Sequence, residues 1–352
     1  LTLNSDKSEA LQSTLSKIRD WSEFSIFDVV RTCGSQDLAV LRVALETVSS
    51  ELGLLEQLQV PRSVFVNYVE AVCGAYNDVP YHNSLHGADV MQGLFSIITN
   101  NSKLLEKTPS VMLFGALVAA LVHDVGHIGR TNHFLVATSH PLALHYNDQS
   151  VLENMHIAKA IELTKGGIDA EHSCDILKPF SSKQRVSIRS IWIKMILHTD
   201  MAHHVPGVFS LNQKLEREGG YEAMSSDNIV STLGTLLHAC DLSNPAKSWD
   251  TYNLWVGRVM EEFYAQSKEE YDLKIDVTLP SEENVQLEQF QIGFLRFITP
   301  FFETVGRIPD ISMEEQAINL KANLAKWEDL RRKTGGGIAQ KTVAVKAASP
   351  RH

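Results

Sequence analysis

Apolar residues recur at helical spacing along nearly the whole chain, and the alternation typical of half-buried strands is almost absent. A helix is predicted after Pro80, and its apolar face holds Met91, Leu94, Phe95 and Ile98. The stretches 165–182, 203–220 and 276–284 are rich in turn-forming residues and are predicted to be loops. The other predicted helices span residues 8–18, 38–58 (interrupted near Gly53), 64–76, 111–124, 150–164, 185–201, 228–242, 250–268, 285–305 and 313–332. The pattern therefore predicts an all-α fold, a compact multi-helix single domain.

The longest apolar run, residues 111–122, is shorter than the ~20 residues that a membrane span needs, and it leads into ionisable groups. It is therefore predicted to be a buried helix. The chain begins at Leu1 with a polar stretch that lacks a signal-peptide pattern, so we expect a fragment whose targeting elements lie outside it. The domain is expected to span residues 1–332. Residues 333–352 are Gly-rich and basic and are expected to be a disordered tail.

Composition narrows the function. The chain is 44% hydrophobic with a net charge of −10, and no basic stripe could neutralise a run of phosphates, which argues against binding to a nucleic acid polymer. A small anionic substrate stays compatible with this charge, because a bound cation can dominate the local field. The four cysteines are far apart and form no CxxC pair, which indicates free thiols and a cytoplasmic location.

Histidine is concentrated in one part of the chain. Eight of the fourteen histidines fall between residues 82 and 156. Three predicted helices end in ionisable residues, and helix ends can converge on one cavity in a helical bundle. The three groups are His82 with His86, His123 with Asp124 and His127, and His238 with Asp241.

Each group also has an ordinary interpretation. An HxxxH pair on a helix is common without a metal, and Asp241 could simply bond nearby backbone at a helix end. Buried carboxylates are costly unless something neutralises them, however, so the joint pattern favours a shared cation. We expect the other histidines of loops and surface to carry no metal: His133, His140, His145, His172, His203 and His204.

The string HDVGHIGRTNHF, residues 123–134, fits HDxxHxGxxNxF, the signature of the class I cyclic-nucleotide phosphodiesterases. The motifs YHNSLHGADV, VLENMH, HTDM, CDLSNP, RVMEEFY and QIGF follow in the order and at about the spacing of that family. The chain thus resembles this family over residues 60–330. The resemblance implies a compact all-α catalytic domain that hydrolyses 3′,5′-cyclic nucleotides to 5′-monophosphates and so ends cyclic-nucleotide signalling.

The resemblance also implies a two-metal site. The ligands of the tighter ion, zinc by analogy, would be His86, His123, Asp124 and Asp241. Asp124 would bridge to a second ion, Mg²⁺ or Mn²⁺, and a water activated between the two ions would be the nucleophile. His82 would be the general acid that protonates the leaving 3′ oxygen. The residues that would orient waters and ligands are His127, Glu153, His156 and, less directly, Asp89.

For the nucleotide, the resemblance implies that Gln291 bonds the purine edge while Phe294 and Val259 clamp the base. An amide can present its donor and acceptor in either order, so the orientation of Gln291 could decide between adenine and guanine. The remaining pocket residues would be Tyr81, Met201, Asn244, Trp255 and Phe263. Without the resemblance, Phe294, Val259 and Phe263 would be interpreted as core residues. Asn244 matches adenine-selective members and favours cAMP, while dual specificity for cAMP and cGMP stays open.

Three positions depart from the family pattern: Met155 replaces a second histidine, His198 stands where a small or apolar residue is usual, and residues 275–289 diverge beside the pocket. Other functions are also conceivable. They are another HD-type nucleotide metallohydrolase, an HD-type di-iron oxygenase, a non-catalytic cyclic-nucleotide-binding regulatory module, and a fold with a purely structural metal. A homodimer is a further possibility.

Overall fold

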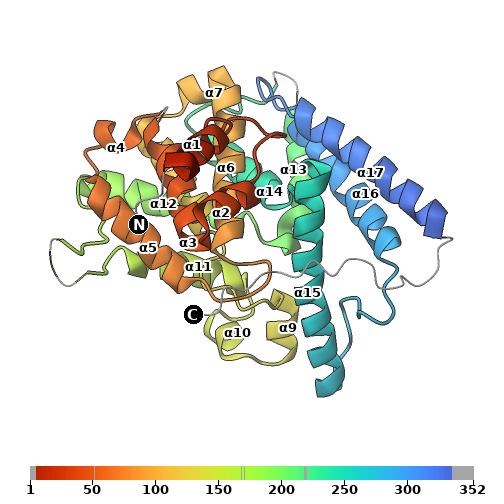
Figure 1. Cartoon of the computed structure of the whole chain (residues 1–352). Helices are drawn as coiled ribbons and strands as arrows, with labels where there is room; N and C mark the ends of the chain where they lie inside the picture. The colour runs from red at the N-terminus through yellow and green to blue at the C-terminus, as the bar shows by residue number, and fades with distance from the viewer. Residues whose placement is uncertain (1–4, 51, 168, 170, 218–219, 335–352) are drawn as a thin grey trace.

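The structure is a computed structural model that describes residues 5–50, 52–167, 169, 171–217 and 220–334. Every regular element in these ranges is helical, so the expected all-α class is confirmed (Figure 1). The α-helices are α1 (Ser5–Leu15), α2 (Ile26–Cys33), α3 (Gln36–Leu45), α4 (Leu54–Gln57), α5 (Arg62–Ala75), α6 (Ser84–Asn100), α7 (Ser102–Lys107), α8 (Ser110–Val122), α9 (Asn132–Ala137), α10 (Pro141–His145), α11 (Val151–Leu163), α12 (Ser182–Leu197), α13 (His204–Leu215), α14 (Ile229–Asp241), α15 (Trp249–Leu273), α16 (Leu287–Val305) and α17 (Glu314–Thr334). Three short helices of other types are η1 (Glu46–Ser50), η2 (Met201–His203) and η3 (Asn244–Ala246).

Two helices form the centre of the core. In α6 the residues from Ser84 to Thr99 are buried on every face, and in α8 the residues from Leu113 to Val122 are buried as well. A helix that is apolar all round needs neighbours on all sides. The helices α3, α8 and α14 pack against α6, and α12 packs against α8. The apolar run 111–122 is therefore a buried helix, as predicted.

The start of α6 and the ends of α8 and α14 lie close together, and the local sequence determines where each of these helices begins or ends. The side chain of Asn83 caps the start of α6 by accepting a hydrogen bond from the Leu85 N–H. Beyond α8, Gly126 and Gly129 adopt positive φ values of 82° and 67°, which turn the chain back. After α14, Pro245 lies in the short helix η3, which separates α14 from α15. The polar residues at these ends therefore face one another.

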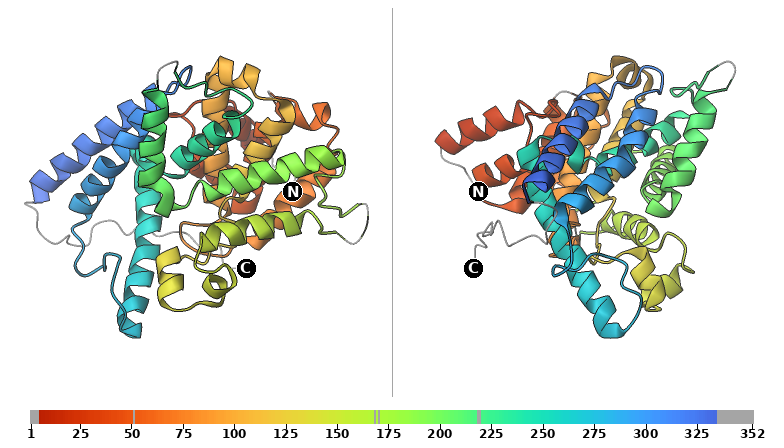
Figure 2. Two further views of the ribbon diagram at one scale, coloured as in Figure 1. Left: turned by 180° about the vertical axis from the view of Figure 1, so that it is seen from behind. Right: turned by 90° about the vertical axis from the view of Figure 1, so that its right-hand side faces the viewer.

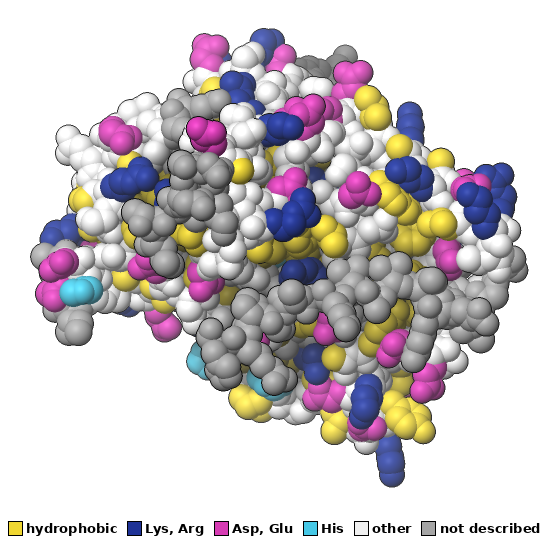
Figure 3. Space-filling view, in the orientation of Figure 1, with side chains coloured by type: hydrophobic (Ala, Val, Ile, Leu, Met, Phe, Trp, Pro, Cys, Tyr) yellow, Lys and Arg dark blue, Asp and Glu magenta, His cyan; other side chains and the backbone are white. Residues whose placement is uncertain are grey.

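The later helices flank this centre. The helices α16 and α17 run side by side, and the long α15 extends beyond the body of the molecule (Figures 1 and 2). The divergent segment 275–289 returns to α15, where Thr278 donates its N–H and its hydroxyl to Glu270 over 2.8 and 2.6 Å. On the face drawn in Figure 3, Lys and Arg side chains are interspersed with Asp and Glu side chains.

One loop prediction was wrong. The stretch 203–220 was expected to be a loop, but residues 204–215 form α13. Pro206 is tolerated because it lies in the first turn, where its missing N–H has no helical acceptor. Leu211 is buried, and Val208 and Leu215 pack against the core at helical spacing. This helix also buries His204, which was expected to be a loop or surface residue.

The ends of the described chain bear on two further expectations. The helix α17 extends to Thr334, two residues beyond the expected domain boundary at 332, and residues 335–352 of the expected tail lie outside the described residues. Among the described helices, none combines the length and apolarity that crossing a bilayer requires. The helices α2, α7, α9 and α10 were not predicted, because each has only five to eight residues and so shows little helical repeat.

Candidate metal and nucleotide site

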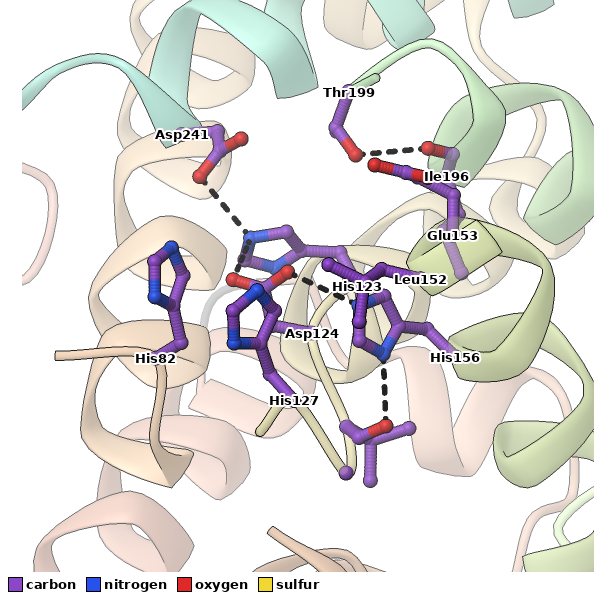
Figure 4. Close-up of polar contacts among 12 residues, drawn as sticks. His82, His123, Asp124, His127, Leu152, Glu153, His156, Ile196, Thr199 and Asp241 are labelled. Carbon is purple, nitrogen blue, oxygen red and sulfur yellow. Dashed lines mark hydrogen bonds and ion pairs between the residues drawn. The ribbon is translucent and has the colours of Figure 1, made fainter. Parts of the chain in front are cut away.

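Four of the predicted ligands meet at the converging helix ends. Donor atoms of His86, His123, Asp124 and Asp241 all lie within 4.8 Å of one another. We call this group the metal cluster. The Nε2 atoms of His86 and His123 lie 3.1 and 3.2 Å from Oδ1 of Asp241. They lie 3.5 and 3.1 Å from Oδ2 of Asp124. One turn after α8 and two helices, α6 and α14, thus supply one set of nitrogen and oxygen donors from distant parts of the sequence. Figure 4 shows His123, Asp124 and Asp241 of this set.

Backbone contacts orient the imidazoles. The Nδ1 atom of His123 donates to the Ala120 carbonyl oxygen over 2.8 Å, which directs Nε2 toward the carboxylates, where a bound cation would replace the Nε2 proton. In the same way, Nδ1 of His156 donates to the Val125 carbonyl over 2.9 Å. His127 is different, because its Nδ1 accepts the Gly129 N–H over 3.0 Å and its proton is therefore on Nε2. His127 is thus prepared to donate a hydrogen bond.

The electrostatics of the metal cluster favour a cation. Burial opposes ionisation of Asp124 and Asp241, but the neighbouring His123 outweighs it and holds both carboxyl pKa values below the usual range. Burial likewise opposes protonation of His123, whose pKa these two carboxylates raise well above its ordinary value. The ligand set contains nitrogen and oxygen only, and burial raises the pKa of the nearby Cys240 thiol, which keeps it from acting as a thiolate ligand. Such a set fits zinc or a harder divalent ion.

Asp124 faces two groups of potential ligands. Its Oδ2 points to His86 and His123, while its Oδ1 lies 3.5 Å from Nε2 of His156. Asp124, His127 and His156 also form a second set with donor atoms within 4.8 Å of one another. One carboxylate can therefore serve two adjacent cations.

His82 lies beside the metal cluster and is held by a residue that the sequence analysis did not single out, Glu262 of α15. One oxygen of Glu262 accepts the N–H groups of Tyr81 and His82 over 2.8 and 2.9 Å, and the other lies 2.6 Å from Nδ1 of His82. Burial opposes protonation of the imidazole, but Glu262 overcomes this and raises the pKa of His82 to about 9. The sequence did contain a signal: Glu262 shares a helical face with Val259 and Phe263, an unusual place for an acid.

Glu153 and His156, both on α11, lie behind the metal cluster. Asn132 donates to both oxygens of Glu153, over 2.9 and 3.2 Å. Burial and then the charge of Asp200 raise the pKa of Glu153 to about 7. Asp200 was also missed, although it lies in the HTDM motif. Ser150 donates to it over 2.7 Å.

The predicted pocket residues fall into two groups. Tyr81 and Trp255 are buried against the His86 ring, with centroid distances of 4.6 and 5.8 Å, and Asn244 donates to the Tyr81 hydroxyl. Gln291 is buried on α16, where Tyr252 donates to its Oε1 over 2.7 Å and its Nε2 lies 3.8 Å from the Met260 sulfur. The remaining predicted residues differ in exposure: Val259, Phe263 and Phe294 are half-buried on α15 and α16, and Met201 is exposed in η2.

The structure also accounts for His198. This residue follows the last residue of α12, and its ring packs against α14 at Gly234, where a Cβ would lie 3.2 Å from the imidazole. A larger side chain at 234 would need the ring to move. The unusual His198 is therefore accommodated by a glycine on the facing helix.

Comparison with known proteins identifies the family to which the chain belongs. Residues 81–318 match a family described as 3′5′-cyclic nucleotide phosphodiesterase. The 3′,5′-cyclic-AMP phosphodiesterase 4C of Mus musculus is 33% identical over 94% of this chain and 48% of its own length. That of Rattus norvegicus is 33% identical over 94% and 61%, and 3′,5′-cyclic-AMP phosphodiesterase isoform F of Drosophila melanogaster is 37% identical over 73% and 39%.

The chain thus spans between 39% and 61% of the length of these curated relatives. The crystal structure of the phosphodiesterase domain of a RhoPDE fusion protein from the choanoflagellate Salpingoeca rosetta superimposes with a TM-score of 0.80 at 28% identity. This match covers 93% of this chain and 100% of that one. The chain therefore belongs to the class I 3′,5′-cyclic nucleotide phosphodiesterase family.

Proposed function

We propose that this protein hydrolyses 3′,5′-cyclic nucleotides to nucleoside 5′-monophosphates, with cAMP as its preferred substrate. The observation that supports this most strongly is the metal cluster with a protonatable His82 beside it. The family membership and the names of the curated relatives agree with this activity.

The cofactors proposed are two divalent cations. His86, His123, Asp124 and Asp241 would hold Zn²⁺, and Asp124 would be shared with Mg²⁺ or Mn²⁺. Bound there, the ions would lower the pKa of water and offset the charge of the phosphate in the transition state. The shared Asp124 would keep the two charges close together, as the opposite directions of its two oxygens allow.

His82 is the proposed general acid. Its Nδ1 is bonded to Glu262, so Nε2 is the nitrogen left to donate. When water adds to phosphorus and the bond from phosphorus to O3′ breaks, His82 would give its Nε2 proton to O3′. The ring of His127 stacks on His82 at a centroid distance of 3.9 Å. Burial and then the charge of His82 lower the pKa of His127, so His127 would stay neutral and orient water through its Nε2–H. Glu153 and His156 would orient water and ligands from α11.

For the base, Gln291 would bond the purine edge, with Phe294 and Val259 on either face. The Tyr252 hydroxyl donates to Oε1 of Gln291, and because a hydroxyl can also accept, the amide can present its donor and acceptor to the base in either order. Asn244, Tyr81, Met201, Trp255 and Phe263 would complete the pocket. Asn244 and the relatives named as cAMP phosphodiesterases together support cAMP ahead of cGMP.

Steady-state kinetics with cAMP and cGMP, with and without a metal chelator, test this function. We expect metal-dependent formation of 5′-monophosphate and a higher kcat/KM for cAMP. Tight cAMP binding without turnover in the presence of zinc and magnesium would instead identify a regulatory module. Elemental analysis that found two irons would identify an oxygenase, because zinc and magnesium cannot support oxygen chemistry.

A cytoplasmic location and a homodimer are also proposed, from the free cysteines and the exposed tip of α15. Tyr271, Leu273 and Val277 are exposed apolar side chains at that tip. Light scattering of the purified protein would test the dimer, and imaging of the full-length protein in cells would test its location.

A further inference from the structure

The chain that follows the metal ligand Asp241 forms a buried turn. We call residues 242–247 the Asp241 turn. It includes η3 and carries Asn244, which bonds Tyr81 in the proposed pocket. Its position therefore affects both the metal cluster and the nucleotide site.

A buried cation lies at the end of this turn. The side chain of Lys247 is 1% exposed, and its Nζ donates to Oε1 of Gln92 over 3.0 Å. The same Nζ lies 3.8 Å from Oδ1 of Asp89 and 4.3 Å from the centroid of the Trp21 ring. Asp89 is 3% exposed, so both charges are removed from water and each depends on the other.

Asp89 and Gln92 belong to the helix that carries His86. They follow it by three and six residues on α6, about one and two turns further along. Lys247 follows Asp241 by six residues. The buried ion pair thus joins the two segments that supply His86 and Asp241, whose donor atoms are 3.1 Å apart.

The backbone of the Asp241 turn is held from outside as well. The Ala246 carbonyl accepts hydrogen bonds from Trp21 Nε1 over 2.7 Å and from Asn319 over 3.0 Å. Asn323 donates to the carbonyls of Pro245 and Lys247 over 2.8 and 2.9 Å. Segments near both ends of the described chain therefore fix the turn backbone, while Lys247 ties it directly to α6.

We propose that Lys247 is a positioning residue for the metal cluster: its contacts with Asp89 and Gln92 fix the separation of His86 and Asp241 and so set the affinity for the cation. This inference rests on the proposed two-metal function. It adds a role for Asp89, which holds Lys247 in place rather than touching a metal.

The test compares Lys247→Met, Asp89→Asn and the double variant with the parent protein. Zinc affinity is measured by competition with a chromophoric chelator, and Tm is measured on the same samples. Lys247→Met leaves Asp89 buried without its partner, so we expect a lower Tm and a roughly 10- to 100-fold weaker zinc affinity, the range for groups that support metal ligands. The double variant removes the uncompensated charge. It should recover most of the Tm and still bind zinc at least about tenfold more weakly than the parent.

Lys326→Met is the matched control. Lys326 also places its Nζ over a tryptophan, 4.9 Å from the Trp249 ring, but it is exposed on α17. Its zinc affinity should equal that of the parent. If the double variant regained the zinc affinity of the parent, or if Lys247→Met matched the control, the positioning role would be wrong.

Two details keep this test decisive. Should Lys247→Met not fold, the zinc affinity of the double variant gives the answer. Zinc affinity is also independent of turnover, so a parent that binds zinc but hydrolyses no cyclic nucleotide would contradict the proposed function and leave the positioning of Lys247 still measurable.

Discussion

Two groups of buried histidines each include a residue of α14, and they differ in their partners. In the metal cluster, Nε2 of His86 and His123 faces carboxylate oxygens at 3.1 to 3.5 Å. In the second group, which we call the histidine pair, Nδ1 of His204 lies 2.8 Å from Nε2 of His238. The aromatic rings of Phe297 and Phe301 surround this pair.

The difference in partners reverses the electrostatics. Carboxylates raise the pKa of His123, whereas burial lowers the pKa of His204 and lowers that of His238 to about 4. His238 and Asp241 are only three residues apart on the same helix. Crowded histidines alone therefore do not define a metal site. The carboxylates that face the imidazoles distinguish the metal cluster from the histidine pair.

The largest effect is expected from removing the shared carboxylate. Asp124→Asn takes one negative charge from both proposed cation sites, and the lost charge stabilisation of several kcal/mol corresponds to a fall in kcat/KM of about a thousandfold or more. Metal content by mass spectrometry should fall as well. The matched control is His204→Gln in the histidine pair. This variant should keep the metal content of the parent protein. Equal metal loss in both variants would mean that the two groups do not differ as described.

A smaller loss is expected from His82→Ala. Loss of a general acid should lower kcat by about a hundred- to ten-thousandfold, while the metal content should stay at the parent level because His82 is not a proposed ligand. The measurement pairs kinetics with elemental analysis. A rate within a few-fold of the parent would show that another group protonates the leaving oxygen.

Glu262→Gln should have a more moderate effect and lower kcat/KM by about 10- to 100-fold. Glu262 raises the pKa of His82, so the protonated acid persists in the parent as the pH rises and is lost only near the folded pKa of about 9. Without the carboxylate this pKa falls, and the alkaline limb of kcat/KM should move to lower pH. The check is a pH–rate profile of both proteins. An unmoved alkaline limb would show that Glu262 does not control the protonation of His82.

The smallest effect concerns the histidine pair and appears only in acid. Because the folded pKa of His238 is lowered to about 4, its neutral form stabilises the protein above the unfolded pKa of about 6.5, and this contribution is lost as the pH falls towards 4. Each imidazole contributes at most about 1.4 kcal/mol per pH unit. His204→Gln removes one such group, so its Tm should fall less than that of the parent between pH 7 and pH 5. An equal fall in both proteins would exclude the pair as a source of acid sensitivity.

The fold class followed from sequence because the apolar repeat is strong in the long helices, such as α6 and α8. The prediction failed at α13, where Pro206 and Gly207 are typical of loops although Val208, Leu211 and Leu215 pack this 12-residue helix against the core. The meeting of His86, His123, Asp124 and Asp241 in one place agrees with what their motifs suggested.

Other features needed coordinates, because they depend on which distant segments touch. Glu262 is 180 residues away from His82, and no local spacing connects them. His204 of α13 likewise contacts His238 of α14, 34 residues further along the chain. The departure at His198 depends in the same way on Gly234 of the facing helix, 36 residues further along the chain.

The helix α15 bears Val259, which is proposed to touch the base, and Glu262, which holds the proposed acid His82, only three residues apart. Because one continuous helix carries both residues, a displacement of α15 would move Val259 and Glu262 together. A shift of α15 that adapted the proposed pocket to a different cyclic nucleotide would therefore also disturb the contact between Glu262 and His82. Such a change would have to come from exchanging individual side chains around the base, one replacement at a time.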